Sequence, residues 1–223
     1  MNHPSPLKTN PYNILIFLAL IALGTSQPAD AKPRDQERWD SKYGTEAYIF
    51  GREPVPFLKQ NIHLLPKGRA LDIAMGEGRN GVYLATQGFE VVGLDISPKG
   101  LEKAQALAKQ NGVTIETRVV DLEKHTLKKN TYDVILMMYY MQRDLWPQIR
   151  DALKPGGMAV IETYNVDHLK HQKFNPKWLL DTNELIQAFG DMKIIRYQAF
   201  EDDNQAYSSI IVQKPGKARS NSR

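Results

Sequence analysis

Three acidic residues, each at the end of a short apolar run, are well placed to bind a small polar molecule. They are Asp72, Asp95 and Asp121, and a glycine-rich stretch with Gly76 and Gly78 follows the first of them. Glycine lets a ligand approach the backbone closely, and the N–H groups at the start of a following helix point at that ligand. Carboxylates around such a turn indicate a site for a nucleoside-containing cofactor.

Two cofactors compete for this site. Gly76, Gly78 and Gly81 spell G-x-G-x-x-G, and Asp95 follows Gly76 by nineteen residues, as in dinucleotide-binding proteins. Asp72, however, would repel a pyrophosphate and attract the ammonium or sulfonium of S-adenosylmethionine (SAM). A reductase-like Tyr-x-x-x-Lys pair is also absent from the sequence. SAM is therefore the preferred cofactor, while NAD(P) and a tight turn without any ligand remain alternatives.

The other two carboxylates fit the rest of SAM. Asp95 is placed to accept the ribose hydroxyls, and Asp121 to accept an adenine amino group. The alternative for each of the three acids is an ordinary strand-end cap.

The elements that must position these residues alternate between strands and helices. Strands are expected at 70–73, 90–94, 114–120, 132–138 and 158–163, the last after a turn at Pro155-Gly156-Gly157, and helices at 79–86, 98–110 and 143–153. This alternation is typical of βαβ units around a parallel sheet. Ser97 and Pro98 suit the start of their helix. Asp181 and Glu184 form a capping-box pattern that opens a helix ending near Phe189. Strands at 192–199 and 206–213 then form an antiparallel hairpin.

The sequence resembles the class I SAM-dependent methyltransferases. The resemblance rests on segments 71–78, 93–95, 120–122, 132–135 and 153–157. It implies a Rossmann-like α/β fold with a mostly parallel seven-stranded sheet of order 3-2-1-4-5-7-6, an antiparallel C-terminal strand and helices on both faces. Within this class, the sequence looks most like the tellurite-resistance and thiopurine methyltransferase type. This likeness rests on segment 76–80 and on the upstream Trp39, Tyr43, Tyr48 and Phe50-Gly51.

The resemblance also implies a set of cofactor-binding residues: Asp72, Ala74, Gly76, Gly78, Asn80, Asp95, Ile96, Asp121, Leu122 and Tyr43. One departure concerns Ala74 and Met75, where the family usually has glycine and often cysteine. The alanine methyl is a small intrusion, so SAM binding is expected to survive with a less open turn.

Methyl transfer from a sulfonium is an in-line displacement, so alignment in a dry pocket supplies most of the catalysis and a dedicated base is optional. No catalytic residue is assigned. The candidate acceptor pocket contains Tyr139, Tyr140 and Tyr164, with Tyr43, Tyr48, Phe50 and Arg52 from upstream. Arg52 and Arg143 are possible partners of an anionic acceptor, although each is more typical of a solvated or helix-pairing charge.

Metal and nucleic-acid binding are disfavoured. The chain has no cysteine, and His168 and His171 are interpreted as surface histidines rather than metal ligands. Four of the charges behind the net +4 lie in the last ten residues, at Lys214, Lys217, Arg219 and Arg223. The 223 residues suit one catalytic domain, 38–214, followed by a basic flexible tail, 215–223.

Residues 1–31 are predicted to be a signal peptide or membrane-targeting segment. The apolar run 14–24 is too short to span a bilayer but fits a signal-peptide core, and Ala29-Asp30-Ala31 fits a cleavage site. Lys32, Arg34 and Arg38 instead favour an uncleaved anchor with the domain on the cytosolic face. A buried core helix is the third alternative. The expectation is therefore membrane targeting or export, with possible membrane association through 14–24.

The first functional hypothesis is an enzyme that transfers a methyl group from SAM to a S, Se, Te, N or O atom of a small molecule. An NAD(P)-dependent Rossmann oxidoreductase is the alternative enzyme. A membrane-tethered SAM-binding module without transfer activity is the alternative outside enzymes.

Overall fold

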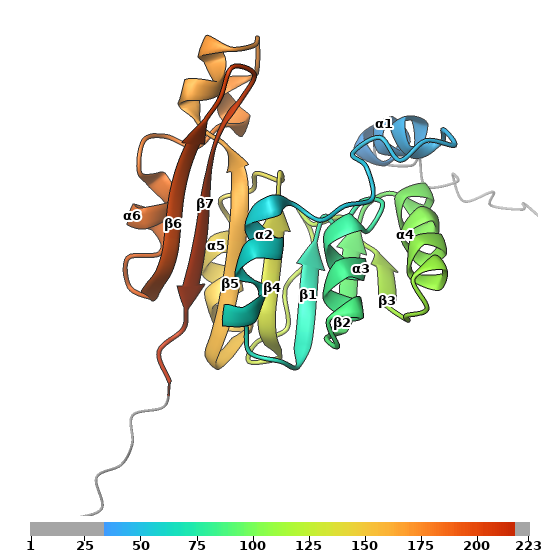
Figure 1. The fold of residues 1–223 in the computed structure, drawn as a ribbon, viewed down its shortest axis with the longest axis horizontal. Helices are drawn as coiled ribbons and strands as arrows, with labels where there is room; N and C mark the ends of the chain where they lie inside the picture. The colour runs from blue at the N-terminus through green and yellow to red at the C-terminus, as the bar shows by residue number, and fades with distance from the viewer. Residues whose placement is uncertain (1–33, 217–223) are drawn as a thin grey trace, which may run out of the picture. The chain divides into compact units, whose positions relative to one another are not determined.

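Seven strands form one sheet in the order β3-β2-β1-β4-β5-β7-β6 (Figure 1). The computed structural model describes residues 34–216. The strands are β1 (Arg69–Ile73), β2 (Glu90–Asp95), β3 (Glu116–Val119), β4 (Tyr132–Met138), β5 (Leu153–Tyr164), β6 (Lys193–Glu201) and β7 (Ala206–Gln213). Strands β1 to β5 pair in parallel, and β7 is antiparallel to both β5 and β6. The predicted strand order and the predicted C-terminal hairpin are confirmed.

Helices cover both faces of the sheet, as predicted. They are α1 (Arg34–Tyr43), α2 (Pro56–Asn61), α3 (Arg79–Thr86), α4 (Pro98–Gln110), α5 (Leu145–Ala152) and α6 (Glu184–Ala188). Short 3-10 turns lie at η1 (Ile62–Leu64), η2 (Val166–Lys170) and η3 (Pro176–Trp178). In Figure 1, α2, α3 and α4 lie in front of the sheet and α5 lies behind it.

The core has two parts, one on each side of the sheet. Because successive strand side chains point to opposite faces, Leu71 packs with Ile149 and Leu185 of α5 and α6. Its neighbour Ala70 packs instead with Leu84 of α3 and with α4. Burying each large apolar side chain contributes about 1.5–3 kcal/mol. These two layers hold the C-terminal ends of the parallel strands at a common edge.

The predicted boundaries agree with the structure to within two residues, apart from two. Strand β5 begins at Leu153, so the predicted turn at 155–157 is a bulge inside the strand, where pairing jumps from Tyr132↔Leu153 to Val134↔Met158. Helix α6 begins only at Glu184, although the Glu184 carboxylate accepts the Asp181 N–H at 2.8 Å as a capping box requires.

Helices α1 and α2 were not predicted. Ten residues form α1, and only Asp40 and Tyr43 of them are buried. The Asp40 carboxylate accepts the Ser97 hydroxyl at 2.6 Å, and the Ser97 hydroxyl oxygen in turn accepts the Gly100 N–H at 3.1 Å. Ser97 is thus the predicted N-cap of α4 and also the anchor of α1.

The predicted targeting segment 1–31, with its apolar run, lies outside the described residues, as does most of the predicted tail 215–223. Within residues 34–216, no helix is both long enough and apolar enough to cross a membrane. The described domain begins with α1, four residues before the predicted start at 38.

Candidate active site

The turn after β1 has a left-handed backbone at three positions. The φ angles are +54° at Ala74, +54° at Gly76 and +88° at Gly78. A Cβ atom at Gly76 would lie 2.7 Å from the Tyr43 hydroxyl oxygen, and one at Gly78 would lie 2.6 Å from the Ala104 Cβ. Both glycines are therefore required here, whereas Ala74 adopts its conformation with a side chain present.

Gly81, the third glycine of the pattern, serves packing beneath the turn. A Cβ atom at Gly81 would lie 2.6 Å from Met75 Cε, and one at Gly93 would overlap the Met75 sulfur. The methionine that replaces the family's cysteine therefore fills the space between α3 and β2. Gly93 on β2 is needed because of Met75.

Asp95 fixes the same turn from the end of β2. Its two carboxylate oxygens accept the Gly76 N–H and the Ser97 N–H, both at 2.8 Å. Burial raises the pKa of Asp95, opposed by these hydrogen bonds. Each carboxylate oxygen has a second lone pair, so Asp95 still has acceptor capacity for ribose hydroxyls.

Asp72 is a buried carboxylate with an unsatisfied oxygen. Its exposed fraction is 2%, and its Oδ2 atom makes no hydrogen bond within the described chain. Burial raises the pKa of Asp72 to about 7, the negative charge of Asp95 adds to the rise, and the Gly81 N–H and Arg79 oppose it. An unsatisfied buried carboxylate is costly, and a cationic ligand group would satisfy it. The residues around the turn therefore fit SAM.

The third carboxylate, Asp121, lies near the same edge. Its side chain is 22% exposed, pairs with Lys124 at 2.9 Å and accepts the Glu123 N–H at 3.1 Å. Burial and then the negative charges of Glu123, Asp121 and Asp95 raise the pKa of Tyr140. Tyr140 thus lies within electrostatic range of two of the three strand-end acids.

The remaining predicted cofactor residues have different surroundings. Ile96 is half-buried beside Asp95, and Leu122 belongs to the core on the α5 side. The Asn80 side-chain oxygen accepts the Val55 N–H at 2.9 Å. Asn80 therefore anchors the segment that leads into α2.

Helix α1 covers the glycine turn. Tyr43 is 5% exposed and stacks on Trp39 with ring centroids 5.4 Å apart. Burial, followed by the charges of Asp95 and Glu77, raises the pKa of the Tyr43 hydroxyl. Tyr43 therefore covers Gly76, next to the predicted cofactor site.

A buried ion pair missed by the sequence analysis holds the loop after α1. Glu77 is 4% exposed, and its carboxylate lies 2.5 Å from Lys103 Nζ of α4. The same ammonium donates to the carbonyls of Thr45 and Ala47, at 3.0 and 2.6 Å. In the sequence, only the position of Glu77 between Gly76 and Gly78 indicates this role.

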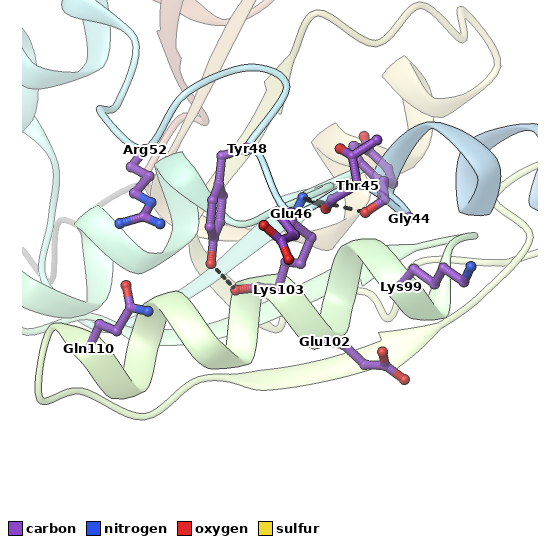
Figure 2. A pocket seen from close by; sticks show the side chains of 10 residues that line it. Gly44, Thr45, Glu46, Tyr48, Arg52, Lys99, Glu102, Lys103 and Gln110 are labelled. Atoms are coloured by element: carbon purple, nitrogen blue, oxygen red, sulfur yellow. Dashed lines mark hydrogen bonds between the residues drawn. The ribbon is translucent and has the colours of Figure 1, made fainter.

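A groove of about 440 Å³ lies between this loop and α4 (Figure 2). Its lining is Tyr43, Gly44, Thr45, Glu46, Tyr48, Arg52, Lys99, Glu102, Lys103 and Gln110. The Arg52 guanidinium lies 4.5 Å from the centroid of the Tyr48 ring, whose hydroxyl donates to the Lys103 carbonyl at 3.0 Å. Figure 2 shows Arg52 and Tyr48 side by side along α4. Arg52 therefore lines this outer groove.

Arg79 occupies the place beside the aromatic residues that the sequence analysis gave to Arg52. Its guanidinium lies 5.7 Å from the centroid of Tyr139 and donates to the Phe50 carbonyl at 2.9 Å. It also opposes the pKa rises of Asp72 and Glu162. Arg79 thus links the predicted cofactor side to the predicted acceptor side.

Predicted acceptor residues from two strands meet in an aromatic cluster. Tyr139, just after β4, lies 5.0 Å from Tyr164 at the end of β5 and 6.4 Å from Tyr207 of β7, between ring centroids. Below it lies Glu162, which is 1% exposed and accepts the Ser209 hydroxyl at 2.7 Å. Tyr140 points elsewhere, with its hydroxyl donating to Gln142 at 2.7 Å.

The surface interpretation of His168 is wrong. The ring is fully buried because η2 packs against β7, and it stacks on Tyr164 with centroids 4.1 Å apart. His171 instead lies 3.0 Å from Glu201. No group of three or more His, Cys, Asp or Glu residues that could hold a metal occurs among residues 34–216. Arg143 is structural, since its guanidinium is paired with Glu184.

Residues 70–157 match the family model of the methyltransferase domain. This match covers the glycine turn, all three carboxylates and the end of β4, on a sheet of the order expected for this fold. Residues 70–157 therefore form a methyltransferase domain, on a sheet with the strand order of the class I SAM-dependent fold. The cofactor of this family is SAM, and the chain's own carboxylates and glycines fit it.

Curated relatives match the part of the chain around this site. A ubiquinone biosynthesis O-methyltransferase from Cereibacter sphaeroides is 33% identical over 102 residues, which are 44% of this chain and 41% of the relative. A ribosomal protein L11 methyltransferase from Thermus thermophilus is 34% identical over 101 residues, 44% of this chain and 39% of the relative. The chain thus spans less than half the length of these two relatives.

Solved structures share the fold of the methyltransferase domain. A SAM-dependent methyltransferase from Methanosarcina mazei superposes with a TM-score of 0.60 at 17% identity, covering 74% of this chain and all of that one. TehB from Haemophilus influenzae gives a TM-score of 0.61 at 16% identity, over 80% of this chain and 66% of that one.

Proposed function

We propose that this protein transfers the methyl group of SAM to an oxygen atom of a small-molecule acceptor. The proposal rests on the position of Arg79. Arg79 interacts both with the unsatisfied Asp72 carboxylate, on the cofactor side, and with the ring of Tyr139, on the acceptor side. Oxygen is preferred because several similar curated proteins are O-methyltransferases. Sulfur, selenium, tellurium and nitrogen acceptors are the other outcomes of the test.

Each part of the site has a separate task in this proposal. Bound SAM supplies a methyl group activated by its sulfonium. Asp72 holds the positive end of the cofactor, while Asp95 accepts from the ribose and Asp121 from the adenine. Tyr43 and Trp39 of α1 cover the turn and exclude water, which strengthens the electrostatic contacts beneath them.

Two measurements test the proposal. Calorimetric titration with SAM, S-adenosylhomocysteine and NADPH identifies the cofactor. Methyl-transfer assays on phenols, thiols, amines and chalcogen oxyanions then identify the acceptor atom. Binding of NADPH in place of SAM would point to the oxidoreductase, and SAM binding without any transfer would point to a binding module.

A further inference from the structure

We propose that Tyr139 and Glu162 form a proton-accepting pair that removes the proton from a hydroxyl of an aromatic acceptor. This inference rests on the proposed methyl transfer and specifies its substrate class. It assigns chemistry to a buried acid that lies in the most apolar part of β5, between Ile161 and Thr163.

Two hydrogen bonds, one between backbone groups and one between side chains, join Tyr139 and Glu162. The Tyr139 N–H donates to the Glu162 carbonyl at 2.6 Å, across the end of the β4–β5 pairing. The Tyr139 side-chain hydroxyl also donates to the Glu162 carboxylate, which burial has stripped of solvent. Tyr139 keeps a φ of +54°, a backbone conformation that non-glycine residues rarely adopt and that is concentrated at functional sites. The pair is therefore preorganised before any acceptor binds.

Four ionisable side chains face the Glu162 carboxylate. They are Tyr139 from β4, Arg79 from α3, Tyr164 from β5 itself and Tyr207 from β7. The only cation among them is Arg79, and the Ser209 hydroxyl completes the shell at 2.7 Å. Burial raises the pKa of Glu162, opposed by the bonds to Ser209 and Tyr139 and by Arg79. A carboxylate with a raised pKa is a better proton acceptor near neutral pH.

The surrounding rings select a planar, uncharged acceptor. Tyr164 lies against Tyr139 on one side and stacks on the buried His168 on the other. Phe174 meets both Tyr164 and His168 edge-on, each at 5.5 Å. Burial lowers the pKa of His168, which keeps this ring neutral. Aromatic faces favour stacking or edge contacts with another ring, so a phenol is the acceptor class that fits.

The proton and electron movements balance. The acceptor oxygen forms its bond to the methyl carbon while the carbon–sulfur bond breaks and its electron pair stays on sulfur. The acceptor O–H proton moves to the Tyr139 oxygen, and the original Tyr139 proton moves to the Glu162 carboxylate. The products are a methyl ether, a neutral thioether and a protonated Glu162, which returns its proton to solvent before the next turnover.

The main test is Glu162→Gln, which keeps the size and shape of the side chain but replaces one carboxylate oxygen with an NH2 group and cannot take up a proton at neutral pH. With 4-fluorophenol as acceptor, kcat is expected to fall about a hundredfold, with little change in KM, and the alkaline rise of the pH–rate profile is expected to disappear. Tyr139→Phe is expected to give a similar loss. Glu201→Gln, an exposed Glu-to-Gln control at the end of β6, is expected to keep the wild-type profile. Unchanged SAM affinity in Glu162→Gln shows that the variant is folded.

A second measurement does not depend on turnover. The protein is saturated with S-adenosylhomocysteine, and binding of 4-fluorophenol is followed by ¹⁹F NMR. Saturable binding is expected for the wild type. Tyr139→Phe is expected to bind 4-fluorophenol at least about fivefold more weakly, because it loses one hydrogen bond. Absence of saturable binding overturns the inference, as does a Glu162→Gln variant with the wild-type pH profile. Methyl transfer to thiols but not to phenols would overturn this inference and leave SAM-dependent methyl transfer intact. A wild-type protein that does not bind SAM would overturn the proposed function as well.

Discussion

The Asp95 carboxylate accepts the Gly76 N–H at 2.8 Å, so the residue that ends β2 also holds the turn that follows β1. The second carboxylate oxygen accepts the Ser97 N–H at the start of α4. One buried side chain therefore sets the positions of two backbone segments that a cofactor would contact. Loss of Asp95 is expected to affect both binding and folding.

Asp95→Ala is expected to weaken SAM binding about ten- to a hundredfold, as for a lost bond to a charged group worth about 1.5–3 kcal/mol. It should also lower Tm, because two backbone N–H groups lose their partner. Asp121→Ala is the control: its ion pair with Lys124 is exposed, so binding falls while Tm changes little. Calorimetry and thermal unfolding measure both effects, and unchanged affinity in a folded Asp95→Ala variant would contradict the ribose assignment.

SAM affinity is expected to rise with pH toward 7, by up to about tenfold per pH unit, because a cationic ligand prefers the ionised form of Asp72. Asp72→Asn is expected to flatten this dependence and to weaken SAM more than uncharged adenosine. The slope that remains reports Asp95, whose pKa is also raised. Titration between about pH 5.5 and 7.5 measures the effect. Equal losses for SAM and adenosine would show that Asp72 only shapes the turn.

The same group affects stability in the opposite direction. Because the pKa of Asp72 in the folded chain, about 7, lies above the ordinary aspartate value of 3.8, the folded state binds the proton more tightly. Its contribution to the free energy of unfolding therefore falls as pH rises from about 4 to 7. Without ligand, Asp72→Asn is expected to be more stable than the wild type above pH 7, as measured by denaturant unfolding.

Ala74→Gly is expected to raise the Tm by about 2–4 °C. A left-handed alanine costs about 1–2 kcal/mol, which exceeds the extra chain entropy of glycine in the unfolded state. Ala85→Gly, the same exchange inside α3, is the control and should lower the Tm, because a helical glycine costs about 1 kcal/mol. A decrease in both variants would mean that the Ala74 methyl contributes packing that outweighs its strain.

A chain of residues 32–223 is expected to fold and bind SAM, since the three carboxylates and α1 all lie within it. A chain starting at Gly44 lacks Tyr43, which covers Gly76, and should bind SAM more weakly. An insoluble or non-binding 32–223 chain would mean that the apolar run 14–24 belongs to the fold. Amino-terminal sequencing of the full-length product then tests the targeting prediction, with a chain starting at Lys32 indicating cleavage and one starting at Met1 an anchor.

The centre of the sheet was predictable because β1, β2, β4 and most of β5 are buried on both sides, so each contains an apolar run between turn residues. The edge strand β3 is mostly exposed. Helix α1 was not, because its ten residues contain no apolar stripe and it is held instead by Asp40 on Ser97. Its position depends on contacts between residues almost sixty positions apart, which no local pattern reveals.

The cofactor side of the site was more predictable than the acceptor side. Strand ends and glycines mark the turn directly, whereas Arg79 reaches Tyr139 only because α3 starts above the edge of the sheet. Glu162 had a usable signal, since a charged residue directly after the apolar run 158–161, inside the same predicted strand, is unusual. Arg52 was predicted in the acceptor pocket but lines the outer groove. Gly51, at φ +74°, turns the chain between Arg52 and Phe50, whose carbonyl accepts a hydrogen bond from Arg79.

Strand β7 is the last strand in the sequence but lies between β5 and β6 in the sheet, with Ser209 opposite Glu162. During synthesis, β5 therefore has an unpaired edge until residues 206–213 have left the ribosome, and unpaired edges invite association with other chains. A nascent chain ending after β5 would already contain the glycine turn and its three acids, but Glu162 would lack Ser209. The residues of the cofactor site thus precede β7 in the sequence. The surroundings of Glu162 are complete only once β7 has joined the sheet.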